Sequence, residues 1–390
     1  MSFSFDFTPE QEELQRSVQD FAERELAPIV VRVDEEDEFP WEIWRKMAAA
    51  PRCWTGAHIP KEYGGKPRPI IDICIITEEL ATVMPIASAL IEVAGFGVMT
   101  IINAGNEEQK KRYLPPIAKG DGLGCFSLTE PVAGSDAAAI VTKAELIGNE
   151  WVINGLKRYL SFAHEAIANE GSYIIVFAKT DYTKGAKGVS AFIVPGNTKG
   201  IKILEMIPCV GLRGHQDEEV LFENCRIPKE NLIGEQGMGF KYALTSLDET
   251  RTTLSAGFIG LARAALKATI DFAKERHTFG KPLAEYQALR FPLTEVAIEI
   301  EAARLLTYKA AWLADRGVRH TVETAGAKAF AAQVMVKATQ VALDTHGGIG
   351  GTKRLPIERY HRDAIIWQFA QGAPNILRLI VSRDLFKQFP

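Results

Sequence analysis

The chain has 390 residues, of which 47% are hydrophobic, 9% aromatic and 24% charged. This composition is typical of a folded globular protein and excludes a disordered, collagen-like or disulfide-scaffold chain. At about 150 residues per domain, the length predicts two to three domains. The formal net charge of −4 gives no reason to expect nucleic acid or an anionic membrane as the main partner.

Cysteine usage and the N-terminus indicate the compartment. The cysteines are odd in number, widely spaced and without a CxxC pair, which predicts free buried thiols rather than a zinc site. They are Cys53, Cys74, Cys125, Cys209 and Cys225. The opening residues MSFSFDFTPEQEELQ lack the regions of a signal peptide, and no run approaches the roughly 18 uninterrupted apolar residues that cross a bilayer. We therefore expect a cytoplasmic protein.

The N-terminal third has helical patterning. Thr8, Pro9 and Gln11 predict a capping box at the start of the first helix. Helical periodicity continues to about residue 120, with breaks in the Pro/Gly cluster between Pro60 and Pro69 and again at Pro85. Residues 71–82 predict a half-buried helix.

From about residue 123 the period changes to that of short strands. Gly148-Asn149-Glu150 predicts a hairpin between two β-rich runs. Further β-rich runs are separated by Gly, Pro and Asn; they cover 173–178, 189–194, 201–204 and 220–222. This block of about 100 residues predicts an antiparallel, barrel-like β-domain.

Beyond Gly237 the apolar spacing returns to that of helices, and the run from Val322 to Asp344 ends at a Gly347-Gly348 stop signal. We expect an α+β chain with a helical domain over 1–122, a β-domain over 123–235 and a helical bundle over 236–390. No GxGxxG, Walker, HExxH or GxSxG motif is present in the sequence. A Rossmann site, metal catalysis and serine hydrolysis are therefore not expected.

A constellation of motifs is spread over the whole chain. It comprises Leu128-Thr-Glu-Pro-Val-Ala-Gly-Ser-Asp136 at the start of the β-domain, Asn154-Gly-Leu-Lys157 closing a strand, Leu247-Asp-Glu-Thr-Arg251 opening a helix, Glu275-Arg-His-Thr-Phe-Gly-Lys281 ending that helix, Gln287, Leu343-Asp-Thr-His-Gly-Gly348 and Arg362-Asp363. In this order and context they resemble the acyl-CoA dehydrogenases, which are FAD-dependent flavoenzymes. The resemblance covers residues 5 to 388. It implies an N-terminal helical domain, a middle β-domain and a C-terminal four-helix bundle. It also implies a homotetramer, one FAD per subunit, an acyl-CoA substrate and an electron-transferring flavoprotein as oxidant.

The resemblance also assigns site residues. Those implied to bind the cofactor are Phe126, Leu128, Thr129, Ser135, Tyr159, Ser161, Arg276, Phe279, Gln287, Asp344, Gly348, Ala373 and Asn375. Those implied to bind the substrate are Ser135, Asp248, Arg251 and Gly372. Arg276 and Phe279 are implied to meet the FAD of a neighbouring subunit.

Several positions depart from the family pattern. Tyr159 stands where the family has a Trp over the flavin, and Ser161 replaces a Thr that contacts the flavin. The segment 162–172 is a few residues longer than the usual loop. Gln371 stands where the catalytic Glu belongs, and an amide cannot accept the α-proton near neutral pH. The other base position of the family is Thr250, and Glu249 would face about 100° away on a helix.

Four interpretations remain open. A single Glu-to-Gln replacement fits poorly, because Ala370, Ala373 and Pro374 also depart from the pattern. The chain could instead be a non-catalytic FAD- or CoA-binding subunit. The favoured interpretation is an enzyme resembling the cyclohex-1-ene-1-carboxyl-CoA dehydrogenases, in which a carboxylate on an N-domain helix removes a γ-proton. An ordinary short- or branched-chain dehydrogenase, or an enoyl-CoA reductase, with another base is the alternative.

The candidate replacement base is Glu92. It lies in Ser88-Ala-Leu-Ile-Glu92, on a helix that in this family forms the floor of the acyl pocket. Some ordinary relatives carry a Glu there that only shapes the cavity. Burial among Leu90, Ile91 and Val93 is expected to raise its pKa, which suits a base working near neutrality. We therefore predict Glu92 and Gln371 as the catalytic positions.

Overall fold

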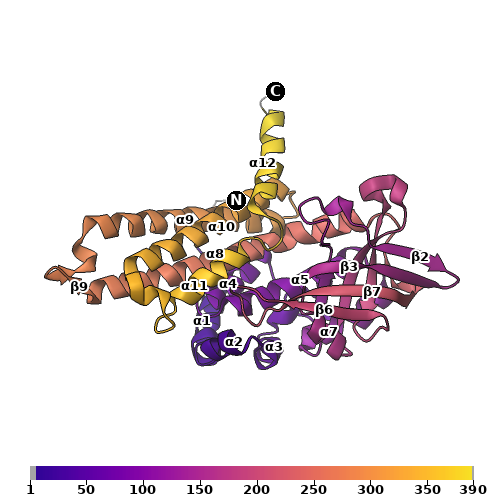
Figure 1. The fold of residues 1–390 in the computed structure, drawn as a ribbon, viewed down its shortest axis with the longest axis horizontal. Coiled ribbons are helices and arrows are strands. Elements are labelled where there is room, and N and C mark those ends of the chain that lie inside the picture. Colours follow the sequence, from indigo (N-terminus) through magenta and orange to yellow (C-terminus); the bar gives the residue numbers. More distant parts are fainter. Residues whose placement is uncertain (1–5, 389–390) are drawn as a thin grey trace.

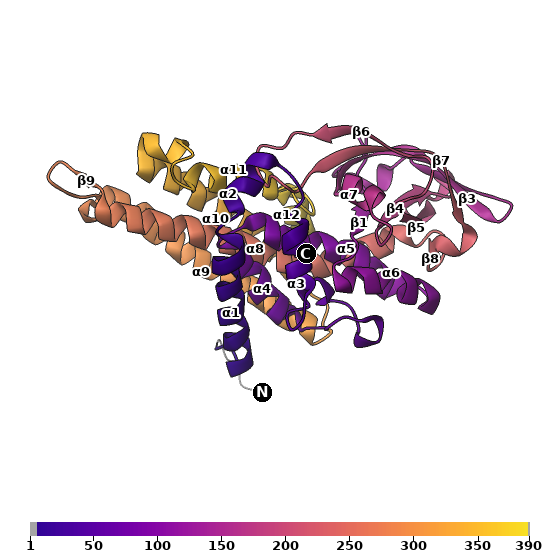
Figure 2. The same cartoon turned by 90° about the horizontal axis from the view of Figure 1, so that it is seen from below.

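The computed structural model describes residues 6–388, apart from the side chain of Ala94. Residues 1–5, on which part of the signal-peptide expectation rests, lie outside this range. A helical region and a β-region lie side by side, with the long helices of the C-terminal third running along the helical region (Figure 1). The helices of the N-terminal third pack beneath them (Figures 1 and 2).

The N-terminal third is helical, as expected. Thr8 caps the first helix, and the predicted capping box with Gln11 is confirmed. The helices are α1 (Pro9–Phe21), α2 (Val30–Glu36), α3 (Trp41–Ala48), α4 (Ile70–Ala81), α5 (Pro85–Ala104) and α6 (Glu107–Lys119). The predicted helix over 71–82 corresponds to α4, and Pro85 opens α5 at its first turn.

Helix α5 bears on the expectation that no segment crosses a membrane. Its 20 residues are long and apolar enough to cross a membrane by length and composition alone, although 82% of its most apolar window is buried inside the fold. It packs against α4, α8 (Gly239–Glu275) and the first strand of the β-region. A core helix with neighbours on several sides is apolar around most of its circumference, which explains the composition.

The middle third is a β-domain. Within the described residues one sheet has eight strands in the order β6-β7-β3-β2-β4-β5-β8, with β1 beside β4. The strands are β1 (Gly124–Ser127), β2 (Lys143–Ile147), β3 (Glu150–Ser161), β4 (Tyr173–Lys179), β5 (Val189–Pro195), β6 (Ile201–Ile207), β7 (Asp217–Pro228) and β8 (Leu232–Ile233). The hairpin predicted at Gly148 and Asn149 is confirmed, since β2 and β3 pair antiparallel across these residues.

Two local predictions in this region were wrong. The sheet is not purely antiparallel, because β1 runs parallel to β4 and β2 touches β4 in the same sense. Asn154–Lys157 does not close a strand: β3 continues to Ser161 through two irregularities in its pairing with β7. The segment 162–172 contains a short helix, α7 (Ala163–Ala168).

The C-terminal third is a helical bundle. Helices α8, α9 (Gln287–Asp315) and α10 (Thr321–His346) pack together, and α11 (Ile357–Trp367) packs on α8 and α10. A two-stranded hairpin of β9 (His277–Thr278) and β10 (Lys281–Pro282) joins α8 to α9. The motif Leu247–Arg251 does not open α8, which begins two turns earlier at Gly239. Helix α10 ends as predicted, with Gly347 at φ 61°.

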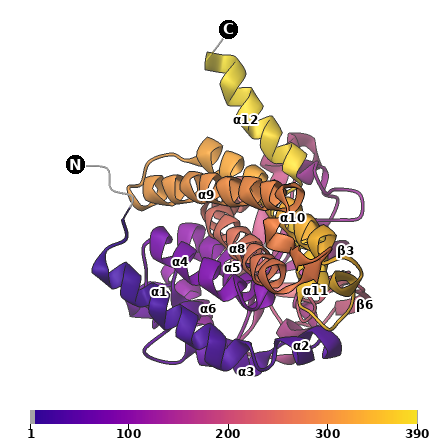
Figure 3. The ribbon, with the colours of Figure 1, turned by 90° about the vertical axis from the view of Figure 1, so that its left-hand side faces the viewer.

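The last helix, α12 (Pro374–Gln388), projects away from the bundle and carries the exposed apolar residues Leu385 and Phe386 near its end (Figure 3). The five cysteines are free thiols, of which Cys74, Cys125 and Cys225 are buried. The other two, Cys53 and Cys209, are only half-buried.

Candidate active site

The loop after α11 folds back onto α8 and brings the two expected base positions together. Thr250 donates its hydroxyl to Gln371 Oε1 at 3.3 Å. The neighbouring Arg251 donates Nε to the Gln371 carbonyl oxygen at 2.9 Å. The two positions where the family pattern places a base are therefore in contact, and neither side chain is a carboxylate.

This loop is held from the opposite side by Lys328, a residue of α10 that sequence reasoning missed. Its ammonium group is fully buried and donates to the carbonyls of Gln368 at 2.6 Å and Gly372 at 2.8 Å. Burial and the nearby Arg251 lower the pKa of Lys328 to about 7. Gln371 adopts φ 58°, an unusual conformation for a residue with a side chain. The hydrogen bonds to its carbonyl and amide offset that strain.

Three of the four predicted substrate-binding residues lie together. Arg251 Nη1 pairs with Asp248 Oδ1 at 3.1 Å, and Thr321 donates to the other oxygen of Asp248 at 2.9 Å. Gly372 lies beside the Arg251 guanidinium, where an added Cβ would be 3.6 Å from Nη2. Ser135 is elsewhere, on an exposed turn between β1 and β2.

Glu92 lies buried in the interface between α5 and α8. The residue is 2% exposed, and the Ser88 hydroxyl donates to Glu92 Oε1 at 3.0 Å. Opposite it is Gly257, where a Cβ would be 3.0 Å from Glu92 Oε1 and 2.8 Å from Trp367 Cη2. Burial raises the pKa of Glu92 well above its ordinary value, and the Ser88 hydrogen bond opposes this shift. The predicted rise in pKa is thus present in the structure.

The same interface connects Glu92 to the Gln371 loop. One turn further along α5, a Cβ on Gly95 would be 3.2 Å from Thr250 Cγ2 and 3.4 Å from His58 Nε2. Gly257 and Thr250 are seven residues apart on α8, about 10 Å at 1.5 Å per residue. Glu92 and Gln371 therefore meet α8 at points about two helical turns apart.

His58 is a second polar group that sequence reasoning missed. Its Nε2 is buried and has no hydrogen-bond partner within the part of the chain that the structure describes. Burial lowers the pKa of His58 to about 4, so the ring is neutral near pH 7. A spacing rule could not find it, because its neighbours Gly95 and Thr250 come from distant parts of the chain.

Glu249 points elsewhere, as its position on the helix predicts. Its Oε2 accepts a hydrogen bond from Asn103 Nδ2 at 3.2 Å, at the C-terminal end of α5. Burial raises its pKa as well. Among the described residues no hydrogen bond joins it to Gln371, so it does not supply a carboxylate at the loop.

The residues predicted to meet the flavin ring come together at the edge of the β-domain. The Arg158 amide donates to the Thr129 carbonyl at 3.0 Å, which places Thr129 beside Tyr159. Tyr159 is 55% exposed and adopts φ 55°, within the irregular part of β3. Phe126 of β1 packs against Phe96 of α5 with ring centroids 5.5 Å apart. Because Phe96 is four residues from Glu92, both lie on one face of α5.

Buried Lys157 fixes this edge. Its ammonium group donates to the carbonyl of Leu128 at 3.2 Å and to Glu130 Oε1 at 2.8 Å, on either side of Thr129. Burial lowers the pKa of Lys157 to about 8, against the influence of Glu130. The motif around Asn154–Lys157 therefore positions the 128–130 segment.

The remaining predicted cofactor residues lie at other places on the bundle. Arg276 and Phe279 are exposed at the hairpin beyond α8, Phe279 at 93%, and Gln287 opens α9 nearby. Asp344 and Gly348 are exposed at the end of α10. Ala373 and Asn375 line a surface hollow at the start of α12, together with Gln333 and Arg378. Helix α8 has 37 residues, about 55 Å, and separates the hairpin from the β-domain (Figure 1). One FAD cannot reach from the hairpin to Thr129 within a single chain.

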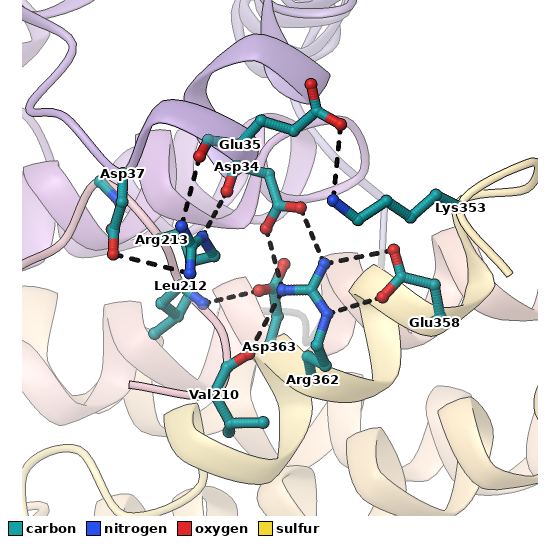
Figure 4. A network of polar contacts seen from close by, with 11 residues as sticks. Asp34, Glu35, Asp37, Val210, Leu212, Arg213, Lys353, Glu358, Arg362 and Asp363 are labelled. Atoms are coloured by element: carbon teal, nitrogen blue, oxygen red, sulfur yellow. Dashed lines mark hydrogen bonds and ion pairs between the residues drawn. The ribbon is translucent and has the colours of Figure 1, made fainter. Parts of the chain in front are cut away.

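Arg362 and Asp363 connect all three parts of the chain rather than lining this site (Figure 4). Arg362 pairs with Asp34 of α2 at 2.7 Å and with Glu358 at 2.6 Å. Asp363 accepts the Leu212 amide at 2.6 Å, and burial raises its pKa to about 7. The sequence singled out this pair, and the structure makes it an interdomain contact.

Comparison with known proteins identifies the family. The chain matches the acyl-CoA dehydrogenase N-terminal domain over residues 8–121, the middle domain over 125–225 and the C-terminal domain over 237–386. It is 38% identical to the short-chain specific acyl-CoA dehydrogenase of Clostridium acetobutylicum, covering 98% of this chain and 100% of that protein. The structure of butyryl-CoA dehydrogenase from Megasphaera elsdenii is 32% identical, with a TM-score of 0.93 over 98% of this chain and 100% of that one. A chain in the structure described as the electron transferring flavoprotein of Acidaminococcus fermentans is 36% identical, with a TM-score of 0.93 over 98% of this chain and 99% of that one.

The chain belongs to the acyl-CoA dehydrogenase family. It is an oxidoreductase that acts on CH–CH groups, and its cofactor is FAD. The residues fit that cofactor: buried Ser127 Oγ, two residues before Thr129, has no hydrogen-bond partner among the described residues, and Tyr159 and Phe279 are large exposed aromatic rings. Within residues 6–388 no group of three or more His, Cys, Asp or Glu is placed to hold a metal ion.

Purified protein should be yellow and hold about one FAD per chain. Arg276→Ala should weaken FAD retention by about tenfold to a hundredfold, because it deletes a charge-assisted contact to phosphate. FAD absorbance after gel filtration at a series of dilutions measures this. Lys274→Ala, the same loss of charge two residues away, should retain FAD normally. Equal retention by both variants would show that Arg276 does not contact the cofactor.

Proposed function

We propose that this enzyme oxidises a cyclic or already unsaturated acyl-CoA similar to cyclohex-1-ene-1-carboxyl-CoA, by 1,4-elimination to a conjugated diene, with Glu92 as the base. The contact between Thr250 and Gln371 carries the proposal. It joins the two base positions of the family at one point that has no carboxylate. Glu92 is the buried carboxylate on the same α5/α8 interface.

The proton chemistry follows from these two side chains. Gln371 cannot accept the α-proton of a saturated acyl-CoA, because a neutral amide is not a base near pH 7. A proton next to a C=C bond is acidic for another reason, since its carbanion is conjugated through the C=C to the thioester. Glu92 accepts that proton, and Ser88 holds its Oε1 in position. FAD, when bound, supplies the hydride acceptor for the same elimination.

The depth of Glu92 supports a compact substrate. It lies against Gly257 at the proposed floor of the acyl pocket, and Gly257 is about two helical turns along α8 from Thr250. A six-membered ring held at the loop brings its distal carbon towards that floor, whereas a long straight chain collides with it. Glu92 shares a face of α5 with Phe96, which packs against Phe126 of the proposed flavin site, and this supports a place for Glu92 near that site.

A second candidate is an ordinary short-chain dehydrogenase that uses another base. It is favoured by the similarity to the short-chain specific enzyme of Clostridium acetobutylicum and to butyryl-CoA dehydrogenase of Megasphaera elsdenii. A non-catalytic FAD- or CoA-binding subunit is the third possibility. The three candidates predict different sets of acyl-CoA thioesters that reduce the bound FAD, and the non-catalytic subunit predicts none.

Two partners belong to the proposal. In this proposal the hairpin serves the FAD of another copy in a homotetramer, and the length of α8 between the hairpin and the β-domain supports it. Exposed apolar residues on α9, among them Phe291 at 59% and Ile298 at 65%, would be covered in such an assembly. An electron-transferring flavoprotein is the proposed oxidant, and anaerobic alicyclic or aromatic degradation in the cytoplasm is the proposed setting. The similarity to a chain in the Acidaminococcus fermentans structure supports the oxidant.

Anaerobic flavin bleaching across a panel of acyl-CoA thioesters tests this function. Cyclohex-1-ene-1-carboxyl-CoA should bleach the flavin rapidly, and butyryl-CoA and octanoyl-CoA slowly, because only the cyclic enoyl substrate has a proton within reach of Glu92. Equal rates for butyryl-CoA and the cyclic substrate would favour the short-chain enzyme. No bleaching by any thioester, with FAD bound, would favour the non-catalytic subunit.

A further inference from the structure

A chain of polar side chains lies beside Ser161, and the proposed proton transfer does not use it. Ser161 Oγ donates to Asp217 Oδ1 at 2.9 Å. His215 Nδ1 lies 3.5 Å from the same carboxylate oxygen. The side chains of His215 and Asp217 are 17% and 14% exposed. The carboxylate is thus largely shielded from solvent.

The backbone determines this arrangement. Pairing between β3 and β7 is irregular between Lys157 and Leu160, and it resumes with Ser161 directly opposite Asp217. Residues opposite each other on neighbouring strands point to the same side of the sheet. The imidazole of His215 is held by an edge contact with Phe162, with ring centroids 4.8 Å apart. The three polar groups therefore have little freedom to separate.

The adjacent carboxylate is committed to a different role. Glu218 follows Asp217 on β7, so its side chain points to the other face of the sheet. Its two oxygens accept the amides of Ala163 at 2.9 Å and His164 at 3.2 Å, at the start of α7. Asp217 is the carboxylate on the same side as Ser161.

The chemistry of a hydrolase does not fit this cluster. In a hydrolytic triad the serine proton goes to histidine, which the acid orients. Here the serine proton goes to Asp217, and His215 contacts the same carboxylate instead of the hydroxyl. Ser161 is therefore not activated as a nucleophile. What the cluster places next to Ser161 is a shielded negative charge.

We propose that Asp217, held through Ser161, lowers the midpoint potential of the bound FAD, and that His215 moderates the effect. The inference rests on the flavin contact proposed for Ser161. Two-electron reduction makes the flavin ring more negative, and a nearby carboxylate disfavours that change. The partial burial of Asp217 limits screening by salt. Asp217 is thus a tuning residue, not a catalytic one.

The test is a spectroscopic redox titration of the holoenzyme against a reference dye, with Asp217→Asn as the main variant. At a fixed solution potential the ratio of reduced to oxidised flavin should rise at least tenfold, which corresponds to about 30 mV for a two-electron couple. His215→Asn should change the ratio in the opposite direction, because it removes the group that offsets the carboxylate. If the cluster only held β3 and β7 together, the two substitutions would not change the ratio of reduced to oxidised flavin in opposite directions.

Glu223→Gln is the matched control. Glu223 lies on the same strand and pairs with Lys202 at the surface at 2.6 Å, so the same loss of charge should leave the ratio unchanged. FAD content is measured first for every variant. Wild-type protein that does not bind FAD would contradict the proposed function. FAD-loaded Asp217→Asn whose ratio of reduced to oxidised flavin is within twofold of wild type would overturn this inference. If Asp217→Asn does not fold, the direction of the His215→Asn shift decides.

Discussion

Glu92→Gln is expected to lower turnover on the best cyclic substrate by about a hundredfold or more, with FAD content and substrate affinity nearly unchanged. The change keeps the shape of the side chain and removes only its ability to accept a proton. Ser88 can still hydrogen-bond the amide oxygen in place of Oε1. Stopped-flow flavin reduction with substrate in excess measures the rate constant, and equilibrium titration measures affinity.

The same side chain should determine the pH dependence. A base must be deprotonated, and burial raises the pKa of Glu92 well above 4.5. Flavin reduction in the wild type should therefore increase with pH as Glu92 ionises. An acid whose pKa is raised by folding binds more protons in the folded state. Its contribution to the free energy of unfolding is present below the unfolded pKa and is lost as pH rises through the folded pKa. Glu92→Gln should remove both dependences.

Glu249→Gln is the control, because burial also raises the pKa of Glu249 although it faces Asn103. That variant should retain wild-type turnover. If Glu92→Gln retains it instead, Glu92 is only a wall of the pocket. Loss of turnover in Glu249→Gln alone would assign the base to Glu249 on α8, beside Asn103.

Gln371→Glu is expected to create activity on straight-chain saturated acyl-CoA. A well-placed general base contributes roughly 10² to 10⁴ in rate. Thr250 already donates to Gln371 Oε1 and would hold a carboxylate oxygen in the same way. The gain is limited by Ala370 and Pro374, which change the geometry of the loop. Bleaching of the variant by butyryl-CoA, compared with wild type, measures it.

Gln368→Glu adds the same carboxylate three residues earlier in the loop and should give no gain. The backbone carbonyl of Gln368 accepts a hydrogen bond from Lys328, and its side-chain Nε2 donates to the Ile365 carbonyl. The side chain is therefore directed away from Thr250. Suppose that Gln371→Glu binds FAD and ligand normally but has no activity on saturated substrates. That result would show that the loop does not lie beside the reacting carbon, so that residue 371 is not the base position in this enzyme.

Much of the architecture could be predicted from local sequence. Capping at Thr8, the turn at Gly148 and Asn149 and the stop at Gly347 depend on a few neighbouring residues, and each was located correctly. The ends of long elements were not. The interior of β3 and the first turns of α8 carry polar, glycine-containing motifs that resemble ends when judged locally. Pairing with β7 continues β3 past its motif despite two irregularities, and packing on α5 accompanies the early turns of α8.

By itself the sequence determined the class of protein and the order of helical and β-regions, and it led to the proposal of Gln371 and Glu92 as the catalytic positions. These depend on residue identity and spacing. Only the tertiary structure decided which distant groups meet. It joined Thr250 to Gln371, buried Lys328 beneath their loop and set His58 against Gly95. It also placed Asp217 opposite Ser161. Spacing along the chain cannot reveal such contacts, because the side chains come from different helices and strands and are fixed by how those elements pack.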